Sequence, residues 1–173
     1  MLLLLTCTKQ AENWNKLMAK HEKTNVMRIL EQKGISFTAH TYEHEEGVAV
    51  DGVTVAGMLG APVENVYKTL VTQGASKEYH VYVIPVACEL DLKKAAKAAG
   101  DKNMELIPVK ELLGLTGYIR GGCSPVGMKK KYPTYLEESC MLFDEIAVSA
   151  GERGHQIILN PADLTSLVDA QVV

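Results

Sequence analysis

The sequence lacks a strong excess of charge of either sign. Its 18 lysine and arginine residues nearly balance its 21 aspartate and glutamate residues, which leaves a formal net charge of -3 at pH 7. Proteins that hold nucleic acid by bulk electrostatics carry a marked positive charge. The composition excludes that mode of binding, so any RNA partner must be held by a local patch.

Paired cysteines are also absent. Cys7, Cys88, Cys123 and Cys140 include no CxxC motif, and no histidine stands near them at ligand spacing. Structural zinc sites are usually built from such closely spaced pairs, so we predict no metal site. Free thiols in a chain without a convincing export signal favour the reducing cytoplasm.

No long hydrophobic run is present. The opening segment "MLLLLTC" has five apolar residues, no preceding basic residue, and Lys9 shortly after it. A secretory signal needs a basic start and an apolar stretch of about 7–15 residues. We therefore predict no membrane partner, and interpret residues 1–24 as an N-terminal extension, with Met18 or Met27 as alternative starts. Residues 25–173 are enough for one well-buried domain.

Periodicity and turn residues predict an α+β domain. The clearest helix signal is "DLKKAAKAAG", in which Asp91 is a helix cap and Gly100 a helix stop. Pro85 is expected to end or bend a central strand. The mixed order of elements fits α+β better than strict βαβ alternation. Helices are predicted at about 11–33, 53–59, 92–99, 108–114 and from 160 onward, and strands at 35–42, 65–73, 78–87, 145–151 and 155–160.

A lysine stands inside the predicted strand "VYKTLV", residues 66–71. Strand alternation places Lys68 on the same face as Val66 and Leu70. A buried ammonium group needs an anion, a carbonyl oxygen or water beside it. Two interpretations follow: Lys68 faces a cleft, or it extends along the sheet edge to solvent.

The segment "GYIRGGCSPVG", residues 117–127, is rich in glycine. Such loops can crowd backbone N–H groups together to hold a phosphate or a carbonyl oxygen. No GK[ST] follows, so the segment is not a P-loop, and a tight structural turn is the alternative. Cys123 and Ser124 have no adjacent histidine to activate them, so we predict that neither is a nucleophile. A second turn, "SAGERG", places Ser149 at a strand end, where a hairpin corner is the alternative role.

Two basic sets and two histidines complete the candidates. His40 and His44 flank Tyr42 in a strand and turn, so they do not form a helical metal pair. The lysines either hold RNA backbone or form solvated surfaces. They are Lys93, Lys94 and Lys97 on the predicted helix, and Lys129, Lys130 and Lys131 after the glycine-rich loop.

The order of these motifs resembles the YbaK/EbsC family of Cys-tRNA(Pro) deacylases. The likeness is carried by "HTYEH", "VYKTLV", "VIPVACELDLKKAAKAAG", "TGYIRGGCSPVGMKKKYPT" and "VSAGERGHQIILNPADL". It runs from about Ile35 to Leu167, nearly the whole chain apart from the extension. A similar domain is inserted in bacterial prolyl-tRNA synthetases. The resemblance implies a single α+β domain in which helices flank a central mixed, barrel-like β-sheet.

The implied activity is that of an aminoacyl-tRNA deacylase, a hydrolase that removes cysteine wrongly joined to tRNA(Pro). A synthetase pocket discriminates poorly between side chains of similar size, so editing removes the error. In this family the substrate thiol is thought to attack its own ester, while the protein positions it and stabilises the oxyanion. The resemblance implies no cofactor, the tRNA(Pro) acceptor end as partner, and a cytoplasmic location. A complex with prolyl-tRNA synthetase and the oligomeric state stay open.

The resemblance also implies which residues act. Lys68 and the backbone N–H of Gly121 are the expected catalytic groups. The expected substrate-binding residues are Tyr42, Thr69, Gly122, Ser149 and Gln156.

Two positions depart from the family pattern and could reshape the pocket. Asp51 stands where relatives have an aromatic residue, and Gln156 stands where some have an acidic one. Deacylation of another small aminoacyl group, such as Ala-tRNA with a positioned water, is therefore an alternative. A further alternative is a non-catalytic module that binds the tRNA 3′ end or a synthetase.

Overall fold

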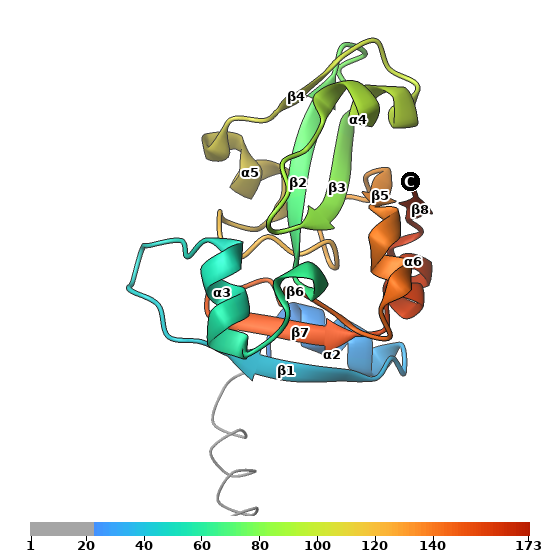
Figure 1. Cartoon of the computed structure of the whole chain (residues 1–173). Coiled ribbons are helices and arrows are strands. Elements are labelled where there is room, and N and C mark those ends of the chain that lie inside the picture. The colour runs from blue at the N-terminus through green and yellow to red at the C-terminus, as the bar shows by residue number, and fades with distance from the viewer. Residues whose placement is uncertain (1–22) are drawn as a thin grey trace, which may run out of the picture.

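The computed structural model describes residues 23–173 (Figure 1). The predicted extension at 1–24, and the first half of the helix predicted at 11–33, lie almost wholly outside the described residues. Within them, helix α2 spans Asn25–Gln32. It begins where the Thr24 hydroxyl accepts a hydrogen bond from the Met27 N–H at 3.3 Å. This cap satisfies one of the four N–H groups that a helix start leaves without a partner.

The strands form two sheets that meet at one strand. Strand β2 (Tyr67–Gly74) belongs to a five-stranded sheet, and the residue before it, Val66, forms a parallel bridge to Ala147 in the three-stranded sheet. The three-stranded order is β1 (Phe37–Thr41), β7 (His155–Leu159) and β6 (Ile146–Ser149). The five-stranded order is β4 (Met104–Leu106), β2, β3 (Tyr79–Pro85), β5 (Thr134–Leu136) and β8 (Gln171–Val172).

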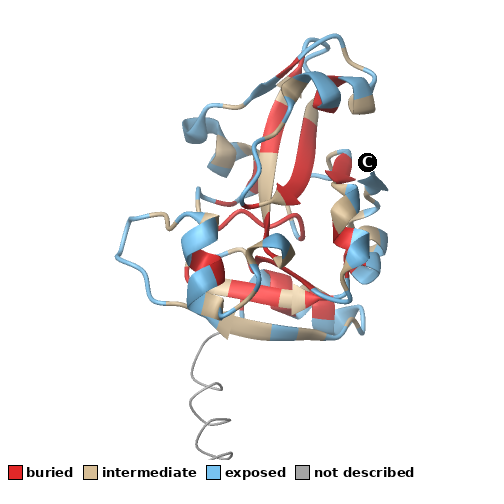
Figure 2. Cartoon of the chain, viewed as in Figure 1, coloured by how far each residue is buried: buried red, intermediate tan, exposed pale blue. Residues whose placement is uncertain are grey.

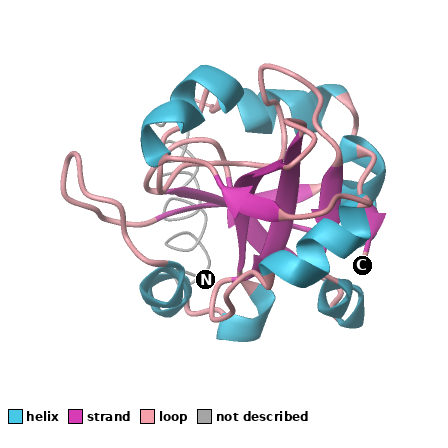
Figure 3. Ribbon diagram, turned by 90° about the horizontal axis from the view of Figure 1, so that it is seen from above, coloured by secondary structure: helices cyan, strands magenta, loops and turns pink. Residues whose placement is uncertain are grey.

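The larger sheet is mixed, as expected. β3 and β8 both run parallel to β5, whereas β2 is antiparallel to β3 and to β4. Helices surround the strands (Figure 3). They are α3 (Gly52–Leu59), α4 (Leu92–Ala99), α5 (Val109–Thr116) and α6 (Pro161–Val168), with short 3-10 helices at Val63–Asn65 and Glu138–Leu142. The predicted α+β class with a mixed sheet and flanking helices is confirmed.

Local sequence signals explain the helix ends. The Asp91 carboxylate accepts hydrogen bonds from the N–H groups of Lys93 and Lys94, and Gly100 ends α4 with a φ of 71°. Asn160 caps α6 in the same way, with Pro161 at the first helical position. The strands that the sequence did not reveal are β4, β5 and β8. They have two or three residues each, too few for an alternating pattern to be recognised.

The β2–β3 pair separates two hydrophobic clusters. One face carries Tyr67 and Val71 into the main core, which includes the fully buried Leu136 and Ile157 (Figure 2). Burying such an aliphatic side chain contributes about 1.5–3 kcal/mol. The opposite face packs against α4 and includes Tyr82. Lys68 lies on this second face, because it pairs with Ile84 in the strand register.

Tyr82 ties the second cluster to its neighbours. Its ring stacks on that of Tyr135 with centroids 4.9 Å apart, and its hydroxyl donates to the Ala95 carbonyl oxygen at 2.8 Å. His80 is on the same face and is only 6% exposed, and neither of its ring nitrogens has a hydrogen-bond partner among the described residues. A buried imidazole without partners is held better neutral than charged.

We predict that His80 makes the fold less stable in mild acid. Burial lowers the pKa of His80 below its ordinary value of 6.5, against smaller opposing effects of Asp101 and Glu78. Its stabilising contribution is therefore complete above about pH 6.5 and is lost as the pH falls through the folded-state pKa. A His80→Phe variant should gain free energy of unfolding relative to the wild type as the pH is lowered from about 7 to about 5. Urea denaturation across this range measures the difference, and parallel curves would contradict the prediction.

Candidate active site

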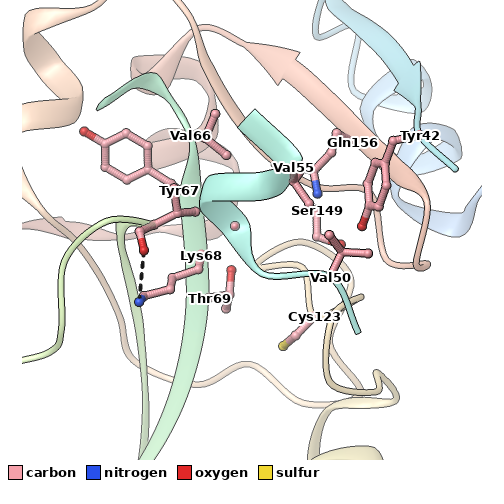
Figure 4. Close-up of a pocket in the computed structure, with 13 residues that line it drawn as sticks. Tyr42, Val50, Val55, Val66, Tyr67, Lys68, Thr69, Cys123, Ser149 and Gln156 are labelled. Atoms are coloured by element: carbon pink, nitrogen blue, oxygen red, sulfur yellow. Dashed lines mark hydrogen bonds between the residues drawn. The ribbon is translucent and has the colours of Figure 1, made fainter. Parts of the chain in front are cut away.

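A small cavity lies where β2 passes the ends of β6 and β7 (Figure 4). Its volume is about 110 Å³. Pockets for drug-sized ligands measure roughly 300–1,000 Å³, so this cavity suits only a small group. Its lining comes from seven segments of the chain, and includes every candidate site residue except Gly122. The lining residues are Tyr42, Val50, Gly52, Val55, Val66, Tyr67, Lys68, Thr69, Val86, Gly121, Cys123, Ser149 and Gln156.

Lys68 is the only positively charged residue among those that line the cavity. Its ammonium group donates a hydrogen bond to the Val86 carbonyl oxygen at 3.3 Å (Figure 4). An ammonium group has three N–H donors, so two remain for a ligand. The side chain is neither fully buried nor extended freely into water. Lys68 is thus held at the cavity by a carbonyl oxygen, one of the partners expected for a lysine at this position.

Two buried polar atoms in the cavity lack partners. Among the described residues, neither the Thr69 hydroxyl oxygen nor the Gln156 side-chain carbonyl oxygen has one. Gln156 is only 6% exposed. Leaving a buried polar group without a partner costs about 1–3 kcal/mol, so the fold keeps these atoms at a loss of stability. Both can accept hydrogen bonds from a ligand.

Strand pairing places Ser149 beside Gln156. The two residues are partners in the β6–β7 register. The Ser149 hydroxyl accepts a hydrogen bond from the Gly151 N–H at 3.2 Å, which fixes the turn that follows β6. Tyr42 comes directly after β1, and its N–H donates to the Gly154 carbonyl oxygen at 2.9 Å. Figure 4 shows Tyr42 and Gln156 on one side of the cavity and Lys68 on the other.

The glycine-rich loop contributes Gly121. Its φ is 88°, and a Cβ atom there would lie 2.9 Å from the Ala49 Cβ, so the position requires glycine. The Arg153 guanidinium donates from Nε to the Arg120 carbonyl oxygen at 2.8 Å and secures the loop to the β6–β7 turn. No described residue accepts a hydrogen bond from the Gly121 N–H. Gly121 is thus a lining residue of the cavity whose N–H makes no hydrogen bond within the described residues.

Gly122 does not line the cavity. Its N–H donates to the Ile119 carbonyl oxygen at 3.0 Å within the loop. A Cβ atom there would lie 3.0 Å from the Arg153 backbone nitrogen. The close approach of two backbone segments explains a glycine at this position.

Two residues at or near the cavity offer no reactive group: Cys123, whose thiol is unreactive, and Asp51, whose carboxylate is engaged in other hydrogen bonds. Burial raises the pKa of the Cys123 thiol to about 12, so almost none of it is thiolate near neutral pH. Asp51 caps α3, and hydrogen bonds from the Thr54 side chain and backbone lower the pKa of Asp51. The Asp51 carboxylate is therefore engaged in capping α3.

The sequence over residues 48–167 matches the family described as the aminoacyl-tRNA editing domain. This chain belongs to the aminoacyl-tRNA editing domain family. A protein of Enterococcus faecalis named as the Cys-tRNA(Pro)/Cys-tRNA(Cys) deacylase EbsC is 46% identical over 150 residues, which cover 87% of this chain and 91% of that protein. The resemblance to the YbaK/EbsC deacylases is confirmed.

Solved structures agree with this assignment. A structure described as a trans-editing enzyme for prolyl-tRNA synthetase is 26% identical, with a TM-score of 0.72, and the match covers 86% of this chain and 92% of that one. A hypothetical protein named APE2540 has the same fold at 20% identity and a TM-score of 0.75, with 85% of this chain and 95% of that one covered. No helix within residues 23–173 of this editing domain is long and apolar enough to cross a membrane.

The basic sets lie away from the cavity of the editing domain. Lys129 donates to the Leu113 carbonyl oxygen at 3.2 Å, and Lys131 pairs with Asp169 at 3.0 Å on an exposed surface. Exposed pairs of this kind contribute about 0–1 kcal/mol. Within residues 23–173, no group of histidine, cysteine and carboxylate side chains, including His40 and His44, is arranged to hold a metal ion.

Sequence reasoning missed the apolar wall of the editing domain's cavity. Val50 and Val55 lie at the start of α3, whereas Val66 and Val86 come from two other segments, and no local pattern joins the three. Gly52 permits their close approach, because a Cβ atom there would lie 2.4 Å from the Val86 Cγ1. The sequence signal for this contact was a glycine at the start of a predicted helix. Because several other residues are also common at helix starts, the glycine alone did not indicate a close contact.

We predict that the thiols differ sharply in reactivity. Cys88 is exposed, whereas Cys123 and Cys140 are buried, and burial raises the pKa of Cys140 to about 11. At about pH 8, iodoacetamide should therefore alkylate Cys88 well before either buried thiol. Peptide mass spectrometry over a time course measures the order, with denatured protein as the control in which all thiols react. Rapid native labelling of Cys123 would contradict the assignment.

Proposed function

We propose that this protein is a deacylase that removes cysteine from Cys-tRNA(Pro). The observation that carries the proposal is the cavity of about 110 Å³ that Lys68 lines together with two unpartnered acceptor atoms, one on the neighbouring Thr69 and one across the cavity on Gln156. A cavity of this size suits a small aminoacyl group. The name of the Enterococcus faecalis relative supports cysteine and tRNA(Pro) as the substrate.

The cavity offers a distinct partner to each part of an aminoacyl ester. The α-ammonium group of the amino acid donates hydrogen bonds, and the free acceptor oxygens of Thr69 and Gln156 can receive them. The ester carbonyl oxygen gains negative charge as it is attacked. The Lys68 ammonium and the Gly121 N–H are the donors placed to stabilise that charge. Tyr42 and Ser149 complete the polar side of the cavity.

The chemistry we propose uses the substrate's own thiol. Its sulfur attacks the ester carbonyl carbon, a carbon–sulfur bond forms, and the bond from that carbon to the ribose oxygen breaks. The thiol proton goes to the ribose oxygen, and water then opens the resulting cysteine thiolactone to free cysteine. The protein contributes orientation and charge stabilisation. The high pKa of Cys123 and the bonded hydroxyl of Ser149 agree with this assignment, since neither is an activated nucleophile.

The proposed partner is the acceptor end of tRNA(Pro) in the cytoplasm. The net charge of -3 gives little general attraction for RNA. We propose that prolyl-tRNA synthetase supplies part of the tRNA selectivity through a complex with this protein. The structure described as a trans-editing enzyme for that synthetase supports the pairing.

We predict that Lys68→Ala abolishes most of the deacylation. Loss of one charge-stabilising donor in an active site typically lowers kcat by about 10²–10³-fold. The measurement is release of labelled amino acid from Cys-tRNA(Pro), Ala-tRNA(Pro) and Pro-tRNA(Pro). Lys102→Ala is the matched control, because it removes the same charge from an exposed loop residue outside the cavity.

Each outcome of this assay has a definite meaning. Release of cysteine alone, lost in Lys68→Ala and kept in Lys102→Ala, is the expected result. Release of alanine instead of cysteine would overturn the cysteine specificity and leave a deacylase. Binding of tRNA without release of any amino acid would overturn catalysis and leave a binding module.

We predict that Gly52→Ala also impairs the reaction. The new methyl group displaces Val86, whose carbonyl oxygen holds Lys68, and a misplacement of about 1 Å in an active site can lower the rate about 10²-fold. Gly57→Ala is a control on the same helix, where a Cβ atom meets nothing within 4 Å. Steady-state deacylation should fall for Gly52→Ala and remain at the wild-type rate for Gly57→Ala. Equal rates for all three proteins would show that the Gly52–Val86 contact does not position Lys68.

A further inference from the structure

Four residues of the glycine-rich loop form a tight turn at the cavity: Ile119, Arg120, Gly121 and Gly122. The Gly122 N–H donates a hydrogen bond to the Ile119 carbonyl oxygen at 3.0 Å, which closes the turn. Gly121, the third residue, has a φ of 88°, whereas the φ of Arg120 is not positive. This combination is typical of a type II β-turn. Because Gly121 lines the cavity, the turn sets how its backbone meets a ligand there.

The residues of the turn leave the direction of its central peptide group open. Types I and II share the same closing hydrogen bond and differ by a rotation of about 180° of the peptide group between the second and third residues. In this turn that group consists of the Arg120 carbonyl and the Gly121 N–H. Glycine at the third position is typical of type II, and glycine at the fourth is typical of type I. Since this turn has both, a contact from outside the turn can decide the orientation.

Arg153 makes such a contact. Its Nε donates a hydrogen bond to the Arg120 carbonyl oxygen at 2.8 Å. Arg153 is half-buried and lies in the turn between β6 and β7. Backbone hydrogen bonds close this turn, from the Ala150 N–H to the His155 carbonyl oxygen at 3.0 Å and from the His155 N–H to the Glu152 carbonyl oxygen at 3.2 Å. The donor is therefore presented from a well-braced hairpin.

The contact fixes the direction of the neighbouring N–H. The peptide group is planar and trans, so its carbonyl and its N–H point in opposite directions. A carbonyl of Arg120 that is held toward Arg153 directs the Gly121 N–H to the other side, where it has no partner among the described residues. Linked hydrogen bonds also polarise one another, so the bond to the carbonyl makes this N–H a stronger donor.

We infer that Arg153 is a positioning residue for the proposed deacylation. Its hydrogen bond to the Arg120 carbonyl oxygen holds the central peptide group in the type II orientation, with the Gly121 N–H turned toward the cavity. The inference rests on the proposed function, in which this N–H stabilises the charge that develops on the ester carbonyl oxygen. Without the bond, the peptide group can rotate to the type I orientation and direct the N–H away from the ester.

The test compares two substitutions of Arg153. In Arg153→Gln the side-chain amide nitrogen occupies the same position along the side chain as Nε does in arginine, so an N–H donor is kept. Arg153→Met has a similar length and no donor. Arg153→Met should lower the kcat of Cys-tRNA(Pro) deacylation about 10²-fold, the effect of a misplaced group in an active site. KM should stay near the wild-type value, because the N–H acts on charge that develops only in the transition state.

The matched variants separate the donor from the charge. Arg153→Gln should retain most of the wild-type kcat, and both Arg153 variants lack the positive charge, so a difference between them comes from the donor. Arg28→Met makes the same change at an exposed arginine of α2 outside the cavity, and its kcat should equal that of the wild type. Thermal unfolding of each variant verifies the fold. A wild-type kcat in Arg153→Met, or an equal loss in both Arg153 variants, would overturn the positioning role.

Nuclear magnetic resonance measures the peptide group without any substrate. Protein labelled with ¹³C at the arginine carbonyl and with ¹⁵N in glycine gives one amide signal for each Arg–Gly pair. The sequence has two such pairs, Arg120–Gly121 and Arg153–Gly154, and the Arg153 variants keep only the first. The signal of Arg153→Gln should coincide with one of the two wild-type signals, whereas that of Arg153→Met should be displaced from both. A signal of Arg153→Met at a wild-type position would contradict the inference.

The two readouts let the proposals fail independently. A displaced Gly121 signal in Arg153→Met, with no deacylation by the wild type, would overturn the proposed function and retain the orienting contact. Deacylation by the wild type with an unchanged kcat in Arg153→Met would retain the function and overturn the positioning role.

Discussion

The structure depends on one strand that serves both sheets. Val66 bridges to Ala147 in the three-stranded sheet, and the chain then continues as β2, paired on both sides within the five-stranded sheet. Backbone hydrogen bonds hold this crossing firmly, since buried N–H and C=O groups must find partners. As a result Lys68 and Thr69 line one cavity with Ser149 and Gln156, which follow about 80 residues later.

The cavity at this crossing departs from the usual pattern of polar-group burial. Most buried polar atoms in a fold have hydrogen-bond partners, yet the Thr69 hydroxyl and the Gln156 carbonyl oxygen have none among the described residues. Apolar side chains at both positions would remove this cost. Their retention beside a cation and a free backbone N–H is the arrangement expected where a ligand completes the hydrogen bonding.

Glycines set the shape of the site by allowing close approach. Gly52 lets α3 lie against Val86, and Gly121 lets the loop reach Ala49. The first contact shapes the cavity, and the second brings Gly121 to its lining. The start of α3 also lines a wider groove of about 610 Å³ beside the cavity. The placement of this one helix thus shapes both.

The sequence by itself determined what local chemistry can specify. Capping by Asp91, the helix start at Asn160, the stop at Gly100 and the strands β2 and β3 depend on neighbouring residues, and each was predicted. The seven candidate site residues came from motif resemblance, and six of them line one cavity. The tertiary structure alone decided that Gly122 does not line this cavity and that four valines form its apolar wall. These features arise from packing between distant segments, and hydrophobic burial is non-directional, so no local pattern encodes them.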